Sequence, residues 1–130
     1  LDEQIEKTKK SSNDKVLHEM YQFVDEGVKI LEDGEIDDFG KLLHENWKMK
    51  KSLSSKISNN KIDDAYNKAI SLGSTGGKIL GAGGGGFLLL FAPQEKHKEI
   101  ESSLRPFQLV KVSFSDKGSE IILNTNKIKK

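Results

Sequence analysis

More than half of the chain's twelve glycines lie between Gly76 and Gly86, immediately before the apolar block Phe87 to Phe91. Glycine loses more backbone entropy on ordering than other residues, so glycines beside a core strand usually serve a positive φ angle or a close backbone approach. Successive backbone N–H groups without side chains between them can converge on an anion. We therefore predict a ligand loop between two buried strands, formed by Gly81, Ala82, Gly83, Gly84, Gly85 and Gly86.

Lys78 is the cation nearest to this loop, and two interpretations of it remain open. It either orients a phosphate or is an exposed strand lysine that faces solvent. The loop itself also has a purely structural alternative, a tight turn packed against a helix. Two nucleotide-binding fingerprints do not fit: the glycines have no Gly-Lys-Ser/Thr ending, and a strand rather than a helix follows the formal G-x-G-x-x-G match at residues 81–86.

A second group of polar side chains lies at the end of a predicted helix and in the serine-rich junction after it. His44, Lys48 and Lys51 are three and four residues apart and share one helix face, and Trp47 lies between this face and the buried one. These residues could contact a ligand. The alternative is a solvated helix face on which one amphipathic tryptophan closes the core. The group consists of His44, Glu45, Trp47, Lys50, Lys51, Ser54 and Ser55.

Composition argues against several functional classes. The chain has no cysteine and three scattered histidines, so we expect neither a disulfide framework nor a metal site. The net charge of +1 and the single arginine, Arg105, argue against a nucleic-acid partner, because bidentate base and phosphate contacts favour arginine. The longest apolar run, Phe87 to Ala92, is too short to span a bilayer. With 35% hydrophobic and 32% charged residues, we expect a globular, cytoplasmic protein without membrane contact.

Three helices are predicted to precede the glycine loop. The first begins at a cap at Asn13 or Asp14, and Asp33-Gly34 ends it. A second helix from about Glu35 to Leu53 follows a short turn, so the two form an antiparallel helical hairpin. Ser58 or Asn59 caps the third helix, which Gly73 ends. The stripe expected to face the core from the first helix comprises Leu17, Met20, Tyr21, Val24, Val28 and Leu31.

From the loop region onward, the sequence predicts four strands and one helix. The strand after the glycines should be central in the sheet, because its continuous apolar sequence indicates two covered faces. The last two strands are joined by a turn at residues 116–118. The order predicts an α+β fold, with a four-stranded antiparallel, ferredoxin-like sheet covered by helices. The strands are Ile79–Leu80, Phe87–Ala92, Gln108–Phe114 and Glu120–Leu123, and the helix is Gln94–Leu104.

The 130 residues are expected to form a single domain, with a polar lead-in at residues 1–12 and a polar tail at residues 124–130. The chain starts at Leu1 and continues into a charged stretch, which resembles the interior of a longer polypeptide. We therefore expect it to be one domain of a larger protein.

The run from Gly77 to Phe87, with Ile62-Asp63 and Leu43-His44-Glu45-Asn46-Trp47 upstream, resembles the C-terminal domain of the GHMP kinases. This is the family of galactokinase, homoserine kinase, mevalonate kinase and phosphomevalonate kinase. The resemblance covers about residues 13–123. The segments most similar to the branch that phosphorylates heptose phosphates are Leu42 to Trp47, Lys50-Lys51, Ile57-Ser58-Asn59 and Gly76 to Gly86.

The resemblance implies an ATP-dependent kinase that transfers a phosphoryl group to a sugar hydroxyl, here of a heptose phosphate. The family's ATP-phosphate loop and the acidic residue that activates the acceptor belong to an N-terminal domain that is absent here. No catalytic residue is therefore expected in this chain, and ATP and Mg²⁺ are expected to bind mainly to that domain. The glycine run corresponds to the family's third motif, which shapes the acceptor site. Many members have threonine or serine where this chain has Leu80, so it lacks a hydroxyl there.

The resemblance also implies a role for the second polar group. We expect the helix end and the serine junction to face the sugar phosphate, with a lysine on its remote phosphate and Trp47 against the sugar ring. The candidate contacts are Trp47, Lys50, Ser54 and Ser55. The partners are then a sugar phosphate and the kinase's own N-terminal domain, and an oligomer is compatible with the sequence. The alternative is a stand-alone regulatory module that holds a small anion in the glycine loop.

Overall fold

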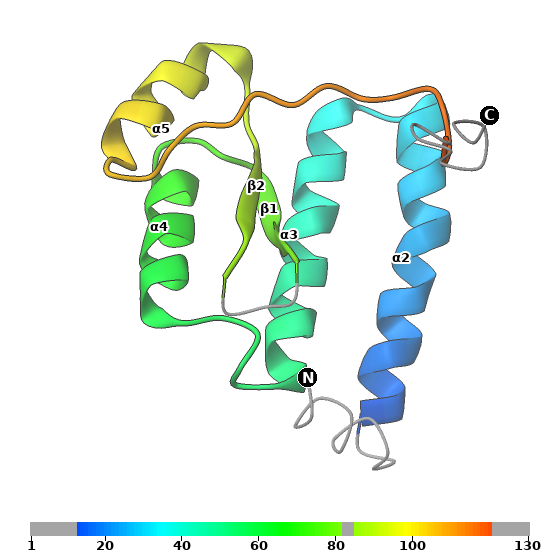
Figure 1. The fold of residues 1–130 in the computed structure, drawn as a ribbon. Helices are drawn as coiled ribbons and strands as arrows, with labels where there is room; N and C mark the ends of the chain where they lie inside the picture. Colours follow the sequence, from blue (N-terminus) through cyan, green and yellow to red (C-terminus); the bar gives the residue numbers. More distant parts are fainter. Residues whose placement is uncertain (1–12, 82–84, 121–130) are drawn as a thin grey trace, which may run out of the picture.

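The computed structural model describes residues 13–81 and 85–120, in which three helices precede a β-hairpin and two short helical segments follow it. Figure 1 shows the arrangement of these elements. The predicted lead-in at 1–12, the tail at 124–130, strand residues 121–123 and loop residues 82–84 lie outside the described residues. The elements are α2 (Asp14–Asp33), α3 (Ile36–Leu53), α4 (Asn60–Ser71), β1 (Gly76–Leu80), β2 (Phe87–Phe91), η2 (Gln94–Lys96) and α5 (His97–Ser103).

α2 and α3 form the predicted antiparallel helical hairpin (Figure 1). At the end of α2, the backbone N–H of Gly34 donates to the carbonyl of Ile30 at 3.0 Å, and α3 begins at Ile36. Gly27 is buried in α2 beside the side chains of Phe39 and Leu42 of α3. A glycine at this contact allows the two helices to pack closely.

Only part of the predicted apolar stripe of α2 faces the core. Leu17 and Met20 pack against the core together with Val16. The other members of the stripe are exposed. The apolar residues of α2 span a wider part of the helix surface than the part that contacts α3. The prediction that the whole stripe is buried is therefore wrong. The exposed members are Tyr21, Val24, Val28 and Leu31.

The core lies between α3, α4 and the hairpin. Its largest buried side chains are Trp47 of α3 and Tyr66 of α4, whose ring centroids are 6.3 Å apart. Asn59, one of the two predicted caps, is the N-cap of α4, because its side chain accepts a hydrogen bond from the backbone N–H of Ile62 at 3.0 Å. The buried cluster consists of Trp47, Leu53, Ile57, Tyr66 and Ile79.

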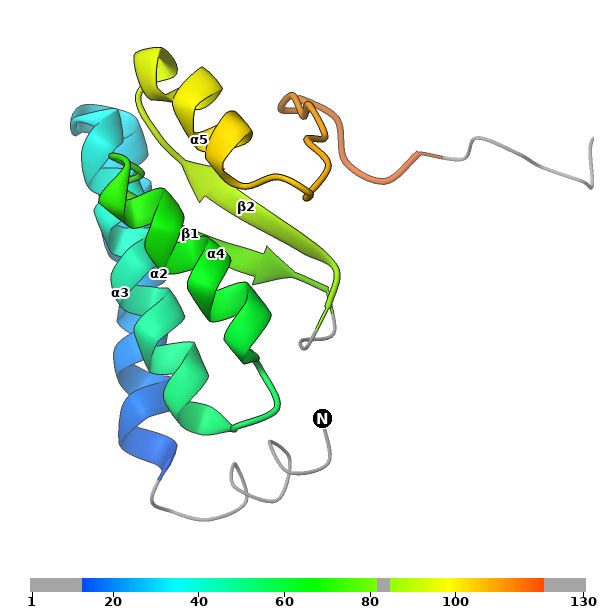
Figure 2. The ribbon, with the colours of Figure 1, turned by 90° about the vertical axis from the view of Figure 1, so that its left-hand side faces the viewer.

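β1 and β2 pair antiparallel, with Lys78 opposite Leu89 and Leu80 opposite Phe87. The pair between these two, Ile79 with Leu88, packs in the core. Because successive strand residues alternate between faces, the Lys78 and Leu80 pairs lie on the face away from the core. Figure 2 shows α2, α3 and α4 together on one side of the hairpin.

The sheet contains two strands within the described residues, not four. Gln108–Phe114 has the alternation of a strand, but it pairs with no strand in the part of the chain that the structure describes, and its apolar side chains are exposed. β2 is an edge strand rather than a central one, and Phe87 at its start is 63% exposed. The α+β class and the helix after β2 are confirmed, the latter as η2 followed by α5. The four-stranded, ferredoxin-like sheet is not confirmed: Gln108–Phe114 lies outside the sheet, because apolar content does not say which faces are covered, and most of the fourth predicted strand lies outside the described residues.

The backbones of α3 and β1 are in direct contact through two glycines. A methyl group at Gly76 would overlap the Gly40 carbonyl and lie 3.0 Å from the backbone nitrogen of His44. A methyl group at Gly40 would in turn overlap the Thr75 side chain and lie 2.9 Å from the ring of Phe91. The position of β1 on α3 therefore requires that neither residue carries a side chain.

We expect Gly76→Ala to lower the free energy of unfolding by about 1–3 kcal/mol or more, because the contact is with backbone that cannot rotate away. Urea unfolding followed by the fluorescence of Trp47, the single tryptophan, measures this. Gly118→Ala is the matched control, since no atom lies within 4 Å of a methyl group there. Equal stabilities of the two variants would contradict the backbone contact.

Candidate functional site

The glycine loop closes the β-hairpin after its last pair, Leu80 with Phe87. Gly81 has a φ of 121° and Gly86 a φ of 101°, a backbone region that favours glycine. A methyl group at Gly86 would also overlap the Leu80 carbonyl. The two ends of the loop thus require glycine for backbone reasons, whatever the loop binds.

Gly85 differs from these two glycines. It is exposed, and no atom of the described residues lies within 4 Å of a methyl group placed on it. The fold itself therefore leaves space beside the backbone at this position. Ala82, Gly83 and Gly84, which complete the predicted ligand loop, lie outside the described residues.

Lys78 lies in β1 on the face of the hairpin away from the core, and it is half-buried. Its cross-strand neighbour is Leu89. Its position beside the hairpin turn fits both a phosphate-orienting lysine and a solvent-facing one.

Trp47 lies in the core rather than on a ligand surface. Its side chain is 1% exposed, between Tyr66 and the Lys51 ammonium, which is 5.8 Å from the indole ring. Stacking of this ring on a sugar is therefore not available in this conformation. Its indole Nε1–H is buried and has no hydrogen-bond partner within the described residues. An unpaired buried donor costs about 1–3 kcal/mol, so this atom is a ready donor to any acceptor that reaches it.

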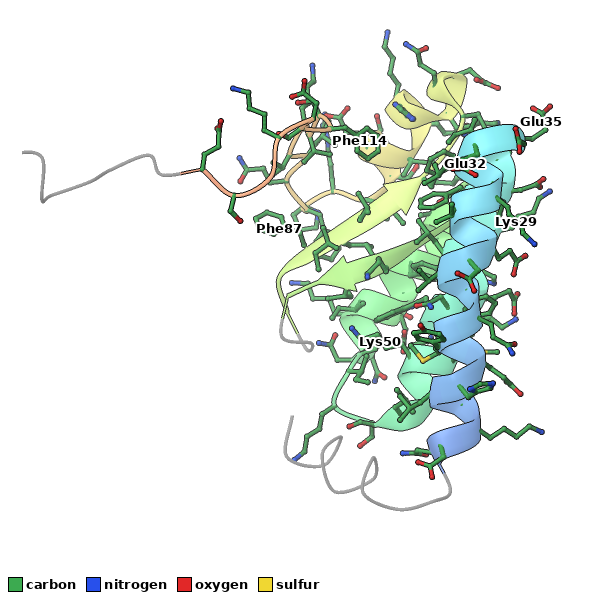
Figure 3. All side chains as sticks on the ribbon, turned by 90° about the vertical axis from the view of Figure 1, so that its right-hand side faces the viewer. Lys29, Glu32, Glu35, Lys50, Phe87 and Phe114 are labelled. Carbon is green, nitrogen blue, oxygen red and sulfur yellow. The ribbon has the colours of Figure 1, made fainter. Side chains whose placement is uncertain are left out.

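The other candidate contacts occupy the end of α3 and the junction after it. Lys50 is half-buried, and Figure 3 shows its side chain on the side of α3 that faces the hairpin. Ser54 is 2% exposed, and its hydroxyl accepts the backbone N–H of Lys56 at 3.2 Å, so it stabilises the turn that ends α3. Ser55 is exposed. The structure thus leaves Lys50 and Ser55 nearer to solvent than Trp47 and Ser54.

The lysines adjacent to Lys50 have partners of their own. Lys51 Nζ donates to Asp63 Oδ1 at 3.0 Å, and the Ser58 hydroxyl donates to the same oxygen at 2.9 Å. Lys48 Nζ donates to Glu45 Oε1 at 3.0 Å on the exposed face of α3. The shared helix face predicted for His44, Lys48 and Lys51 therefore serves contacts within the domain.

His44 and Tyr66 form a pair that the sequence pattern did not reveal. His44 Nδ1 lies 2.7 Å from the Tyr66 hydroxyl, and the two rings are stacked with centroids 5.8 Å apart. The backbone N–H of Gly77 in β1 lies near enough to the Tyr66 hydroxyl to favour its ionised form. Burial raises the pKa of Tyr66 to about 12, against the opposing effect of the Gly77 N–H, and the carboxylate of Glu45 raises it further. Tyr66 is therefore protonated at neutral pH.

The described residues contain neither a cluster of metal ligands nor a membrane-spanning helix. No group of three or more His, Cys, Asp or Glu side chains in ranges 13–81 and 85–120 could hold a metal ion. Over the same ranges, no helix is both long enough and apolar enough to cross a membrane.

Residues 28–109, more than half of the chain, match the family model described as GHMP kinases C terminal. The chain belongs to the GHMP kinases. The matched range contains α3, α4, both strands and the glycine loop. The family resemblance found in the sequence is thereby confirmed.

Curated relatives of this GHMP kinase domain include two sugar kinases. The D-glycero-alpha-D-manno-heptose 7-phosphate kinase of Campylobacter jejuni is 34% identical over 109 residues, which cover 80% of this chain and 32% of that protein. The bifunctional fucokinase/GDP-fucose pyrophosphorylase of Arabidopsis thaliana is 35% identical over 79 residues, 60% of this chain and 7% of that protein. The chain thus spans about a third of the first relative and much less of the second.

A solved structure has the same fold as this GHMP kinase domain. L. major mevalonate kinase in complex with R-mevalonate superposes with a TM-score of 0.64 at 20% sequence identity. The match covers 78% of this chain and 32% of that one. It supports the arrangement of helices and hairpin described above.

The buried Tyr66 hydroxyl predicts a loss of stability at high pH. Its pKa is higher in the folded state, about 12, than its ordinary value of 10.0. Its contribution is therefore complete below pH 10 and is lost as the pH rises towards 12. Wild type should lose about 2 kcal/mol more free energy of unfolding than Tyr66→Phe between about pH 9 and about pH 12.

Urea unfolding at both pH values measures this difference. Tyr21→Phe, at the exposed tyrosine, should keep the wild-type pH dependence. A Tyr66→Phe variant with the same pH dependence as wild type would show that the Tyr66 hydroxyl does not have a raised pKa.

Proposed function

We propose that the chain is the substrate-side domain of an ATP-dependent sugar kinase that transfers a phosphoryl group to a hydroxyl of a heptose phosphate. The observation that carries this proposal is the 34% identity to a heptose 7-phosphate kinase over 80% of the chain, combined with exposed glycines at positions 81, 85 and 86 inside the family match. The Arabidopsis relative, named as a fucokinase, supports a sugar acceptor more generally.

In this proposal the loop at residues 81–86 borders the phosphoryl acceptor. The acceptor hydroxyl oxygen attacks the γ-phosphorus of ATP, the bond to the β-phosphate oxygen breaks, and the hydroxyl proton passes to a base. Such transfer depends mainly on positioning and on stabilisation of charged phosphate oxygens. Gly81 and Gly86 fix where the loop leaves and rejoins the strands, and the open space at Gly85 lets a ligand approach the backbone.

Lys50 is proposed to contact the phosphate that the acceptor already carries. It is the lysine of the α3 end that lies towards the hairpin, whereas Lys51 is paired with Asp63 and Lys48 with Glu45. Ser55 follows on the exposed side of the same junction, and Lys78 lies on the hairpin face beside the loop. Trp47 and Ser54 support this surface from beneath, since both are buried.

The rest of the chemistry is assigned to protein outside this chain. ATP and Mg²⁺ are proposed to bind mainly to an N-terminal kinase domain, which also supplies the base, and none of the residues described here is assigned a catalytic role. The chain covers 32% of the heptose 7-phosphate kinase, which leaves room for such a domain in a protein of that size. The complete enzyme is proposed to work in the cytoplasm, and its oligomeric state is left to measurement.

The function is tested by assaying the complete polypeptide with ATP and Mg²⁺ against heptose 7-phosphate, galactose, fucose and mevalonate. We expect the highest kcat/KM with heptose 7-phosphate and no turnover by residues 1–130 alone. Lys50→Met should raise KM about tenfold or more for heptose 7-phosphate, because a charged hydrogen bond contributes about 1.5–3 kcal/mol. Its effect on galactose, which carries no phosphate, should be small.

Lys56→Met, at an exposed lysine beyond α3, is the matched control for Lys50→Met. A preferred acceptor without a phosphate would refute the heptose phosphate assignment. Absence of phosphoryl transfer to every acceptor, with ATP still bound, would refute the kinase function and favour an anion-binding module.

The role of the loop has a separate test at Gly85. The methyl group of Gly85→Ala meets no atom of residues 13–81 or 85–120, so stability should be unchanged. If a ligand uses that space, kcat/KM of the complete enzyme should fall about tenfold or more, equivalent to about 1.4 kcal/mol. Gly118→Ala, which is also sterically free, should have no effect. Wild-type kinetics for Gly85→Ala would make the loop a purely structural turn.

A further inference from the structure

We propose that the exposed apolar residues of α2 are the contact surface for a second copy of the polypeptide, whose α2 packs antiparallel across a twofold axis. These residues, called the outer stripe here, are Tyr21, Val24, Val28 and Leu31. The inference goes beyond the proposed function, because it depends on neither the acceptor nor kinase activity. It assigns a role to side chains that the packing of the domain leaves uncovered.

The outer stripe lies on the outside of the domain. Its four side chains are between 48% and 72% exposed. Figure 1 shows α2 at the edge of the domain, and in the view of Figure 3 no other described element lies in front of it. Single exposed apolar side chains are common, but four in one line along a helix form a continuous patch of the kind that marks an interaction surface.

The spacing of the outer stripe fits a second helix. Its members follow one another at intervals of three, four and three residues, which is the a/d spacing of helices that pack side by side. This order of intervals is the same in both directions along α2. An antiparallel copy therefore brings Tyr21 opposite Leu31 and Val24 opposite Val28, and the twofold axis repeats each contact.

The charged residues beside the outer stripe are complementary in the same register. Asp25, Lys29, Glu32 and His18 are exposed along one side of it. In the antiparallel pair, Lys29 of each copy lies near Asp25 of the other, so the two Lys29 ammonium groups flank the Asp25 carboxylates that meet near the axis. Glu32 lies near His18 of the other copy, whose ring can donate a hydrogen bond to it. Both pairs occur twice and favour this register.

A parallel pair would lack these contacts. In parallel helix pairs, the charged residues on one side of the apolar seam pair with residues on the other side of the partner's seam. The other side of this stripe carries Met20 and Gly27, which have no charge and pack within the domain. A different segment of the same polypeptide would not need to match both the apolar spacing and the charges about one axis. A second α2 is therefore the occupant that fits both.

The oligomeric state of the complete polypeptide tests the surface. A pair of single helices is a small interface, so we expect a dissociation constant in the micromolar range. Sedimentation at about 100 μM should then show a dimer. Val24→Glu should raise the dissociation constant about hundredfold or more, because its carboxylate would be buried near Asp25 of the second copy. Asn67→Glu, which adds the same charge at an exposed position of α4, is the matched control and should leave it unchanged.

Cysteine cross-linking tests the antiparallel register. Residues 1–130 contain no cysteine, so after replacement of any cysteine elsewhere in the polypeptide by serine, each variant carries one thiol. A mixture of Tyr21→Cys and Leu31→Cys should form a disulfide-linked dimer on mild oxidation. Either variant alone should not, because its two thiols would lie about 15 Å apart along the helices, beyond the reach of a disulfide.

Each result decides the inference. A monomer at the same concentration would overturn it and leave the outer stripe to another part of the same polypeptide. A dimer whose dissociation constant Val24→Glu does not change would place the interface elsewhere. Cross-linking of either cysteine variant with itself would refute the antiparallel register. An enzyme that phosphorylates nothing would end the proposed function, and the sedimentation and cross-linking results would still decide the dimer.

Discussion

The structure depends on the direct contact between the backbones of α3 and β1. Gly40 and Gly76 let the helix and the strand approach until no side chain fits between them, and the methyl group of an alanine at either position would overlap its neighbour. Because β1 is fixed on α3 in this way, its position also determines the position of its antiparallel partner β2 and the points where the loop leaves and rejoins the strands. The buried cluster of Trp47, Tyr66 and Ile79 then fills the space between the hairpin, α3 and α4.

Signals within short stretches of sequence were sufficient to predict the helices and the hairpin. Asp33-Gly34, Asn59 and Gly73 mark helix ends through backbone and side-chain capping that involves only near neighbours. The glycine loop was predictable because its glycines lie between two short apolar runs. The family was also accessible from the sequence, since the glycine run and the α3 segment around Trp47 lie within the matched residues.

Contacts between residues that are distant in the sequence could not be predicted in the same way. Apolar residues on α2 and in Gln108–Phe114 have the periodicity of buried elements, but periodicity does not reveal which neighbour covers them. The sequence left open whether Trp47 contacts a ligand or closes the core, because its place on the helix circumference fits either role, and the structure places it in the core. His44 and Tyr66, whose side chains are in hydrogen-bond contact, are 22 positions apart, and no spacing rule connects them.

The two edges of the hairpin are chemically unlike. β1 lies directly against the α3 backbone at Gly76. β2 has no strand beyond it within residues 13–81 and 85–120. An unpaired strand edge is a template for another extended segment. A strand that paired beside β2, from the same polypeptide or another, would therefore leave the contact between β1 and α3 undisturbed.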